Sequence, residues 1–208
     1  GQEFGQFIEW DEKKPLDWML LGYDKHRQLQ DYVKDLNHLY RDTPALWQVD
    51  YSWEGFQWIV PDDSKQSVIA FLRRDAAGKM LLVVCNFNPV LRQGYQMGVP
   101  NPGSYKEILN SDDKKYGGSG VTNGTVKAEK GEMHGFELHI SLTLPPLSTV
   151  YLQVPAARKP RAKKAVEKAE TPAKPVKKPA AKKAAPAAEA AAPAPKRRGR
   201  PAKAKTPV

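Results

Sequence analysis

Apolar residues follow a helical spacing in the first part of the chain. From residue 24 onward they recur at three- and four-residue steps, which places them on one face of an α-helix; the set is Leu29, Tyr32, Val33, Leu36, Leu39 and Tyr40. Asp24 is a suitable N-cap, and Pro44 limits the far end. The opening segment up to Tyr23 shows no sustained period of either kind. We therefore predict an ordered loop followed by one amphipathic helix over about residues 25–42.

The pattern then changes to short β-prone runs separated by Gly, Pro, Asn and Asp. These runs cover residues 56–60, 68–72, 80–87, 105–109, 136–144 and 149–154. In the run from Leu138 to Leu144 apolar and polar residues alternate, as expected for a strand with one buried face. Residues 75–78, Asp-Ala-Ala-Gly, are typical of a hairpin connection. The runs together predict a mostly β fold, an antiparallel β-sandwich.

Composition separates a third region. Of the 33 Lys and Arg residues, 17 lie from Ala156 onward beside only 3 of the 23 acidic residues, so this end carries a net charge of +14. The preceding 155 residues keep 16 basic and 20 acidic residues, a net of −4, together with every aromatic residue. The Lys-, Ala- and Pro-rich end has too little apolar surface to offset the entropy of ordering. We predict a disordered basic tail over residues 155–208.

Cysteine content and hydropathy limit the setting of the protein. Cys85 is the single cysteine, so no internal disulfide can form, and its apolar neighbours favour packing as a small hydrophobe. No apolar stretch approaches the ~20 residues needed to span a bilayer, and no signal segment opens the chain. These features predict a cytoplasmic protein without membrane contact. The chain starts with Gly and enters an aromatic-rich segment at once, which we interpret as a fragment of a larger protein.

Several ordered blocks of residues resemble one enzyme family. They are Gly1–Gln6, Glu9–Trp10, Leu16–Trp18, Asp35–Asn37, Gly55–Ile59, Leu81–Pro89, Tyr105–Asp112 and Ser141–Thr149. In this order they resemble the end of the bacterial glycogen branching enzymes of the α-amylase superfamily, over about residues 1–154. The resemblance implies a (β/α)8 barrel followed by a C-terminal β-sandwich, and an activity that cleaves an α-1,4-glucan and reattaches the segment through an α-1,6 bond.

The resemblance also implies a division of this chain. Residues 1–50 would be the last loop and helix of the barrel, residues 51–154 the all-β C-terminal domain, and residues 155–208 the tail. The chemistry requires two carboxyl groups about 5 Å apart, one acting as nucleophile and one as acid/base. The family places these carboxylates upstream of the matched segment, so no catalytic residue maps onto this chain. We expect the 208 residues alone to be inactive.

Glu3, Glu9 and Trp10 are the candidate substrate-binding residues. Following the resemblance, both carboxylates would sit where barrel loops face the substrate, at the C-terminal ends of the strands. An indole stacks well on a sugar ring, and Trp10 lies in the loop segment, whereas we expect Trp18, Trp47, Trp53 and Trp58 to be buried between barrel and sandwich.

Other polar groups give no sign of a second active site. For the adjacent pairs Asp62–Asp63 and Asp112–Asp113, solvation in turns is a sufficient explanation. The four histidines show no metal-ligand spacing, and the Gly-rich stretch 117–120 lacks the Lys of a phosphate loop. We predict neither a metal nor another cofactor.

The end of the tail contains the candidate nucleic-acid-binding residues. Arg198, Gly199, Arg200 and Pro201 form the core of an AT-hook. Gly199 would let the backbone approach the floor of a narrow A·T minor groove, while Arg198 and Arg200 enter its negative potential. The same charge is also typical of a solvated appendage, or of a segment that binds acidic proteins or phosphorylated glucan.

Two alternatives to the enzyme interpretation remain open. A freestanding glucan-binding module predicts saturable binding to glycogen and exposure of Trp10 or Trp18. A nucleic-acid-associated protein predicts salt-dependent binding to A·T-rich DNA that disappears when residues 156–208 are deleted.

Overall fold

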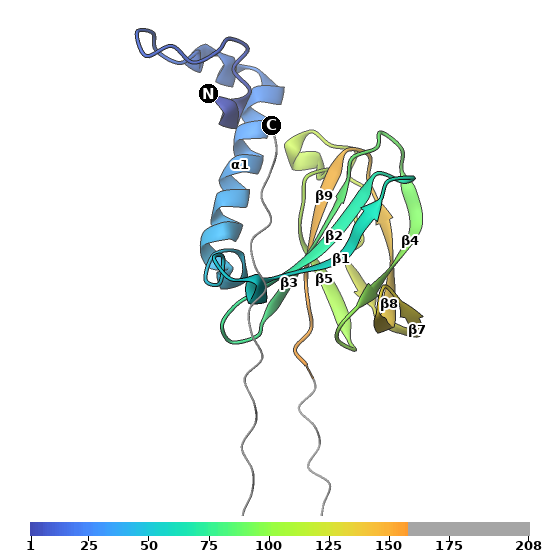
Figure 1. Ribbon diagram of the computed structural model, residues 1–208. Coiled ribbons are helices and arrows are strands. Elements are labelled where there is room, and N and C mark those ends of the chain that lie inside the picture. The colour runs from blue at the N-terminus through green and yellow to red at the C-terminus, as the bar shows by residue number, and fades with distance from the viewer. Residues whose placement is uncertain (158–208) are drawn as a thin grey trace, which may run out of the picture. The chain divides into compact units, whose positions relative to one another are not determined.

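A computed structural model describes residues 1–157 of the chain, with one long helix ahead of nine strands (Figure 1). The helix is α1 (Asp24–Asp42). The strands are β1 (Phe56–Asp63), β2 (Val68–Arg74), β3 (Met80–Asn86), β4 (Arg92–Val99), β5 (Ser104–Asn110), β6 (Thr125–Lys127), β7 (Glu129–Met133), β8 (Phe136–Leu144) and β9 (Ser148–Gln153). Five short 3-10 helices accompany them: η1 (Gln2–Phe4), η2 (Trp18–Gly22), η3 (Pro44–Leu46), η4 (Trp53–Gly55) and η5 (Lys114–Tyr116).

Helix α1 lies where the apolar spacing predicts it, but its N-cap differs. Tyr23 occupies the cap position with an extended backbone, and no side chain accepts a capping hydrogen bond. The prediction of Asp24 as N-cap is wrong because Asp24 is already helical, and its carboxylate pairs with Arg27 one turn later. A carboxylate in the first turn still interacts favourably with the helix dipole. The far end is as expected, with Thr43 as C-cap just before Pro44.

The predicted antiparallel β-sandwich is confirmed. A six-stranded sheet has the order β1-β2-β3-β9-β5-β6, and a three-stranded sheet has the order β4-β8-β7. All strand pairs are antiparallel. The connection after β2 is the predicted hairpin, with Gly78 at φ +79° in its turn.

The main core lies between the two sheets. Strand β8 supplies Ile140, Leu142 and Leu144, each no more than 1% exposed, which confirms the alternation predicted for residues 138–144. Val84 and Leu152 come from the facing six-stranded sheet and are fully buried. Burial of one such aliphatic side chain stabilises a fold by about 1.5–3 kcal/mol. The sandwich therefore has a closed core of its own.

A second, smaller cluster covers part of the outer face of the six-stranded sheet. Ala45 of η3 packs with Leu81 and Val83 of β3. Arg73 of β2 fastens the same segment, because its Nη2 donates to the carbonyl oxygen of Leu46 at 3.0 Å. The stretch that follows α1 is thus held against the sheet.

Helix α1 also contacts the sandwich directly. The Asp35 carboxylate accepts hydrogen bonds from the Tyr116 hydroxyl at 2.6 Å and from Lys115 Nζ at 3.0 Å, and Lys25 Nζ donates to the carbonyl oxygen of Gly117 at 3.1 Å. The Tyr32 and Tyr116 rings meet edge to face with centroids 5.1 Å apart. Even so, no residue of α1 is buried. None of the helices among residues 1–157 has the length and apolar character required to cross a membrane.

Candidate functional site

The three predicted substrate-binding residues lie around one pocket at the start of the chain. Its volume is about 650 Å³. The lining consists of Gly1, Gln2, Glu3, Gln6, Phe7, Ile8, Glu9 and Trp10. The fold of this loop therefore brings Glu3, Glu9 and Trp10 together around one pocket.

Several contacts hold the loop that forms this pocket in place. Phe4 is fully buried, and its ring packs on Trp18 with centroids 5.2 Å apart. The Phe4 carbonyl oxygen lies 2.7 Å from His26 Nδ1 of α1, and Gly5 closes η1 in the left-handed conformation at φ +70°. Gln6 Oε1 accepts a hydrogen bond from the Asp17 amide at 2.9 Å. The loop is therefore ordered, as the sequence predicts.

The open side of the pocket combines carboxylates with exposed apolar surface. The Trp10 side chain is 72% exposed and Phe7 81% exposed. A hydrogen bond from its own backbone amide lowers the pKa of Glu3. The Glu3 carboxylate is thus ionised at neutral pH and can accept hydrogen bonds from hydroxyl groups.

The adjacent aspartate pairs play structural roles, and solvation alone does not explain them. Asp63 accepts hydrogen bonds from the Tyr95 hydroxyl at 2.9 Å and from the backbone and side chain of Gln66. Asp112 accepts hydrogen bonds from the backbone amides of Ser119 and Val121. The expectation of purely solvated pairs is wrong for these two residues, because each carboxylate holds a turn together through neighbouring donors.

Two of the four histidines form hydrogen bonds with the backbone. His26 contacts the Phe4 carbonyl, and His134 Nδ1 accepts a hydrogen bond from the Gly98 amide at 3.2 Å. Within residues 1–157, no three His, Cys, Asp or Glu side chains gather in a way that could hold a metal ion. Cys85 is a free, partly buried thiol, and burial raises its pKa.

The five tryptophans are all open to solvent within the described part of the chain. Their exposed fractions run from 42% for Trp47 to 85% for Trp53. Burial of Trp18, Trp47, Trp53 and Trp58 between barrel and sandwich stays a prediction, since the described residues do not include a barrel. Trp53 is the most exposed indole, and no local sequence pattern distinguishes it from the other tryptophans. The AT-hook residues Arg198, Gly199, Arg200 and Pro201 lie outside the described residues.

The chain is similar to known proteins over most of its length. The family model described as "Alpha amylase, C-terminal all-beta domain" matches residues 58–155. A protein of Aquifex aeolicus named 1,4-alpha-glucan branching enzyme GlgB is 53% identical over 155 residues, which is 74% of this chain and 25% of that protein. A protein of the same name from Rubrobacter xylanophilus is 53% identical over 154 residues, 74% of this chain and 21% of that protein. The chain thus spans about a quarter or less of the length of these relatives.

Proposed function

This chain is homologous to the C-terminal portion of bacterial 1,4-α-glucan branching enzymes, and we propose that it forms the end of an enzyme that transfers α-1,4-glucan segments into α-1,6 branches during glycogen synthesis. The observation that carries the proposal is 53% identity sustained over 155 residues. The family model of the sandwich covers residues 58–155 alone, so a similarity over 155 residues extends beyond the sandwich.

The proposal assigns the catalytic carboxylates to residues upstream of Gly1. Retaining transfer needs two carboxyl groups about 5 Å apart. The carboxylates of Asp63 and Asp112 are committed to holding turns and cannot serve as this pair. The 208 residues alone are therefore expected to have no branching activity.

Residues 1–50 are proposed to complete the catalytic barrel. Helix α1 has an apolar stripe but no buried residue, and Leu29 on that stripe is 37% exposed. An amphipathic helix of a globular protein normally buries such a stripe against a core. The barrel part of the enzyme would supply that core.

Glu3, Glu9 and Trp10 are proposed to contact the glucan beside the reacting centre. The exposed Trp10 ring offers a flat apolar face to a sugar ring, and the two carboxylates accept hydrogen bonds from sugar hydroxyls. None of the three performs the bond exchange. Their contribution would be to hold the glucan in position.

The sandwich is proposed to cap and stabilise the barrel. Its own core is closed, and it is fastened to α1 through the contacts of Asp35 with Tyr116 and Lys115. The alternative, a freestanding glucan-binding module, would require no upstream barrel. A cytoplasmic location stays a prediction.

The decisive experiment starts from the coding DNA upstream of Gly1. An in-frame barrel with its two catalytic carboxylates is expected there, and the full reading frame should convert amylose to a product whose side chains are released by a debranching enzyme. The 208-residue chain, purified alone, is the matched control and should give none. Branching by the short chain, or a full reading frame without branching activity, would overturn the proposal.

Binding of DNA or another polyanion through the tail is a second proposal, which rests on the sequence alone. The Arg-Gly-Arg-Pro core at residues 198–201 and the net charge of +14 from Ala156 onward favour it. The two proposals are compatible, because the tail lies outside the region that resembles the enzymes.

A further inference from the structure

A loop of the sandwich lies against the first turns of α1. This Gly117 loop comprises residues 111–121, between β5 and β6, and contains η5 together with the Gly-rich stretch 117–120. Lys25 Nζ donates to the carbonyl oxygen of Gly117 at 3.1 Å. A Cβ atom at Gly117 would lie 2.3 Å from Gln28 Oε1 and 2.7 Å from Lys25 Nζ. The backbone of the loop therefore approaches the helix so closely that only glycine fits without displacing these side chains.

Several hydrogen bonds fix the shape of the Gly117 loop. The Asp112 carboxylate accepts hydrogen bonds from the backbone amide of Ser119, at 2.9 Å, and from its hydroxyl. Asp113 Oδ1 accepts the Lys115 amide at 3.0 Å and so caps η5. The glycines of this stretch therefore belong to an ordered support that reaches α1.

A neighbouring side of the same helical turns carries the N-terminal loop, residues 1–10, which includes all three candidate substrate-binding residues. His26 Nδ1 lies 2.7 Å from the carbonyl oxygen of Phe4. A Cβ atom at Gly5 would lie 3.2 Å from Leu29 Cδ2. The backbone that presents the candidate residues therefore rests on α1.

Both loops thus contact one short segment of α1. Residues three positions apart lie on the same side of a helix. Lys25 and Gln28 form the side that meets the Gly117 loop, and His26 and Leu29 form the side that meets the N-terminal loop. Because the two sides belong to the same hydrogen-bonded turns of backbone, a shift of one moves the other.

A second contact, further along the helix, sets its direction. Asp35 lies about 15 Å from Lys25 along the helix axis, at a rise of about 1.5 Å per residue. Its carboxylate accepts hydrogen bonds from the Tyr116 hydroxyl at 2.6 Å and from Lys115 Nζ at 3.0 Å. The Tyr116 ring also meets the Tyr32 ring edge to face. Two separated contacts fix both the position and the direction of α1 relative to the sandwich.

We propose that Gly117, Lys25 and Tyr116 are positioning residues, which hold α1, and through it the N-terminal loop, in the geometry that the glucan requires. The contact of the N-terminal loop with glucan rests on the proposed function. None of the three residues touches the glucan or takes part in the bond exchange. Such residues matter because a misplacement of about 1 Å, caused far from the chemistry, can cost about a hundredfold in rate.

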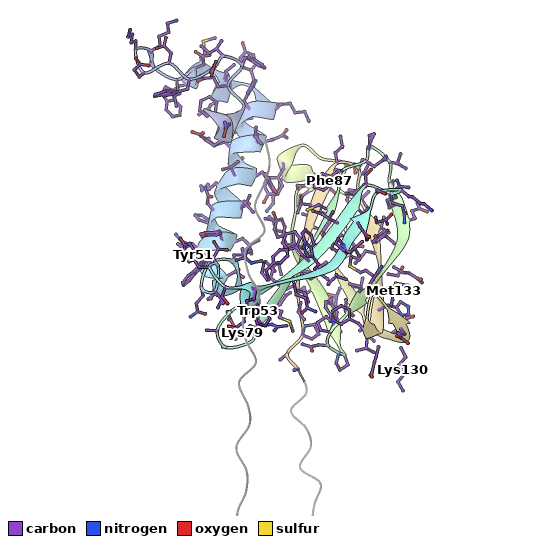
Figure 2. The ribbon with its side chains drawn as sticks, in the orientation of Figure 1. Tyr51, Trp53, Lys79, Phe87, Lys130 and Met133 are labelled. Atoms are coloured by element: carbon purple, nitrogen blue, oxygen red, sulfur yellow. The ribbon has the colours of Figure 1, made fainter. Side chains whose placement is uncertain are left out.

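Gly117→Ala is the main variant, and Gly78→Ala is its matched control. Both glycines have φ +79°, so alanine adds a similar backbone strain at each position. The Cβ atom at Gly117 displaces Gln28 and Lys25, whereas a Cβ atom at Gly78 has no neighbour within 4 Å. Figure 2 labels Lys79, which follows Gly78, at the end of the sandwich away from the first turns of α1.

The first measurement is the branching of amylose by the full reading frame. Gly117→Ala should raise KM about fivefold, which corresponds to about 1 kcal/mol. The kcat should stay nearly unchanged, because only the holding of the glucan is weakened. Gly78→Ala should leave KM and kcat unchanged, although its melting temperature should fall as much as that of Gly117→Ala.

Substitutions at the other two positions test the same contacts without backbone strain. Lys25→Met should also raise KM, and Lys25→Arg should restore it, because a guanidinium can donate to the carbonyl oxygen of Gly117. Tyr116→Phe keeps the ring and removes the hydroxyl. Its effect on KM should be smaller, because Lys115 still holds Asp35.

The second measurement is hydrogen exchange followed by mass spectrometry, which needs no activity and reports how firmly the N-terminal loop is held. It is made on the 208-residue chain and on the full reading frame. The amides of Gly5 and Gln6 donate to carbonyl oxygens within the loop. They should exchange faster in Gly117→Ala and in Lys25→Met, but not in Gly78→Ala.

Two outcomes would overturn the proposal. One is unchanged exchange of the N-terminal loop in both Gly117→Ala and Lys25→Met, since the two loops would then be independent. The other is an equal rise of KM in Gly78→Ala, because a general loss of stability would explain both variants. A parent reading frame without branching activity would instead refute the proposed function, and the exchange measurement would still decide whether the two loops are coupled.

Discussion

Removal of one hydroxyl group from the core tests how the sandwich is held together. The Tyr105 side chain is fully buried, and its hydroxyl donates to the carbonyl oxygen of Asn101 at 2.9 Å and accepts the Asn101 amide at 3.1 Å. Tyr105→Phe keeps the ring and leaves both backbone groups without these partners. A buried polar group without its hydrogen bond costs about 1–3 kcal/mol. We therefore expect the free energy of unfolding to fall by about 2 kcal/mol at pH 7.

The same substitution has a predictable pH dependence. Burial raises the pKa of Tyr105 to about 12, whereas an unfolded tyrosine titrates near 10. The folded state therefore binds the proton more tightly, so this contribution is complete below about pH 10 and is lost as the pH rises towards 12. The difference between the parent chain and Tyr105→Phe should shrink over this range, because phenylalanine has no proton to lose.

Urea unfolding followed by circular dichroism at pH values from 7 to 11 measures this difference. Tyr51→Phe is the control, since Tyr51 is fully exposed and should show no change at any pH. Other buried tyrosines also lose protons at high pH, but they are common to both proteins and cancel in the comparison. Equal stability of Tyr105→Phe and the parent chain at pH 7 would refute the hydrogen-bond argument. A stability difference that stays constant up to pH 11 would refute the titration argument.

Three further predictions concern other parts of the chain. Asp35→Asn should weaken the contact of α1 with the sandwich by less than about 1 kcal/mol, because the carboxylate is partly exposed. Hydrogen bonds from Tyr116 and Lys115 lower the pKa of Asp35 in the folded state. In urea unfolding, the higher stability of the parent chain should therefore be present above the pKa of the unfolded state and be lost as the pH falls through the pKa of the folded state. Gly98→Ala would place a Cβ atom 2.0 Å from a backbone oxygen of β7 and should lower the melting temperature by several degrees, whereas Gly22→Ala has open space and should not. Deletion of residues 156–208 should abolish binding to A·T-rich DNA in a mobility-shift assay, and the affinity of the intact chain should fall steeply with salt; unchanged binding after the deletion would exclude the tail as the contact.

The sequence predicts those strands whose burial is visible in the pattern of apolar and polar residues of the strand itself. Alternation in β8 and the continuous apolar run of β3 are visible because one or both faces of each strand are buried. Strand β4 escapes the pattern, because Gly94 with φ +65° forms a bulge and interrupts its alternation. Strands β6 and β7 are short and mostly exposed at sheet edges, so hydrophobicity gives no signal there.

Groups of interacting side chains also differ in whether the local sequence predicts them. Glu3, Glu9 and Trp10 are neighbours in the chain, so one ordered loop is enough to place them around a pocket. Gln57 and Arg74, in contrast, come together only through the register of β1 with β2. The link between Asp35 and Tyr116 joins residues 81 positions apart. Contacts of this kind depend on tertiary pairing, and no local pattern contains them.

The sandwich and helix α1 differ in how much apolar surface they bury within the described residues. This difference predicts which part of the proposed enzyme can fold first. The sandwich buries its aliphatic side chains between two sheets and so has the core of an independent folding unit. Helix α1 has no buried residue, and in proteins most of the stability of a helix comes from packing of its amphipathic face. Apart from the edge-to-face contact of Tyr32 with Tyr116, its contacts with Tyr116 and Lys115 are polar and partly exposed, and such polar contacts add little stability. We expect the remaining stabilisation to come from a surface that covers the stripe containing Leu29, which the proposed barrel would supply. Residues 1–50 would then depend on the barrel for stability, while the sandwich would not.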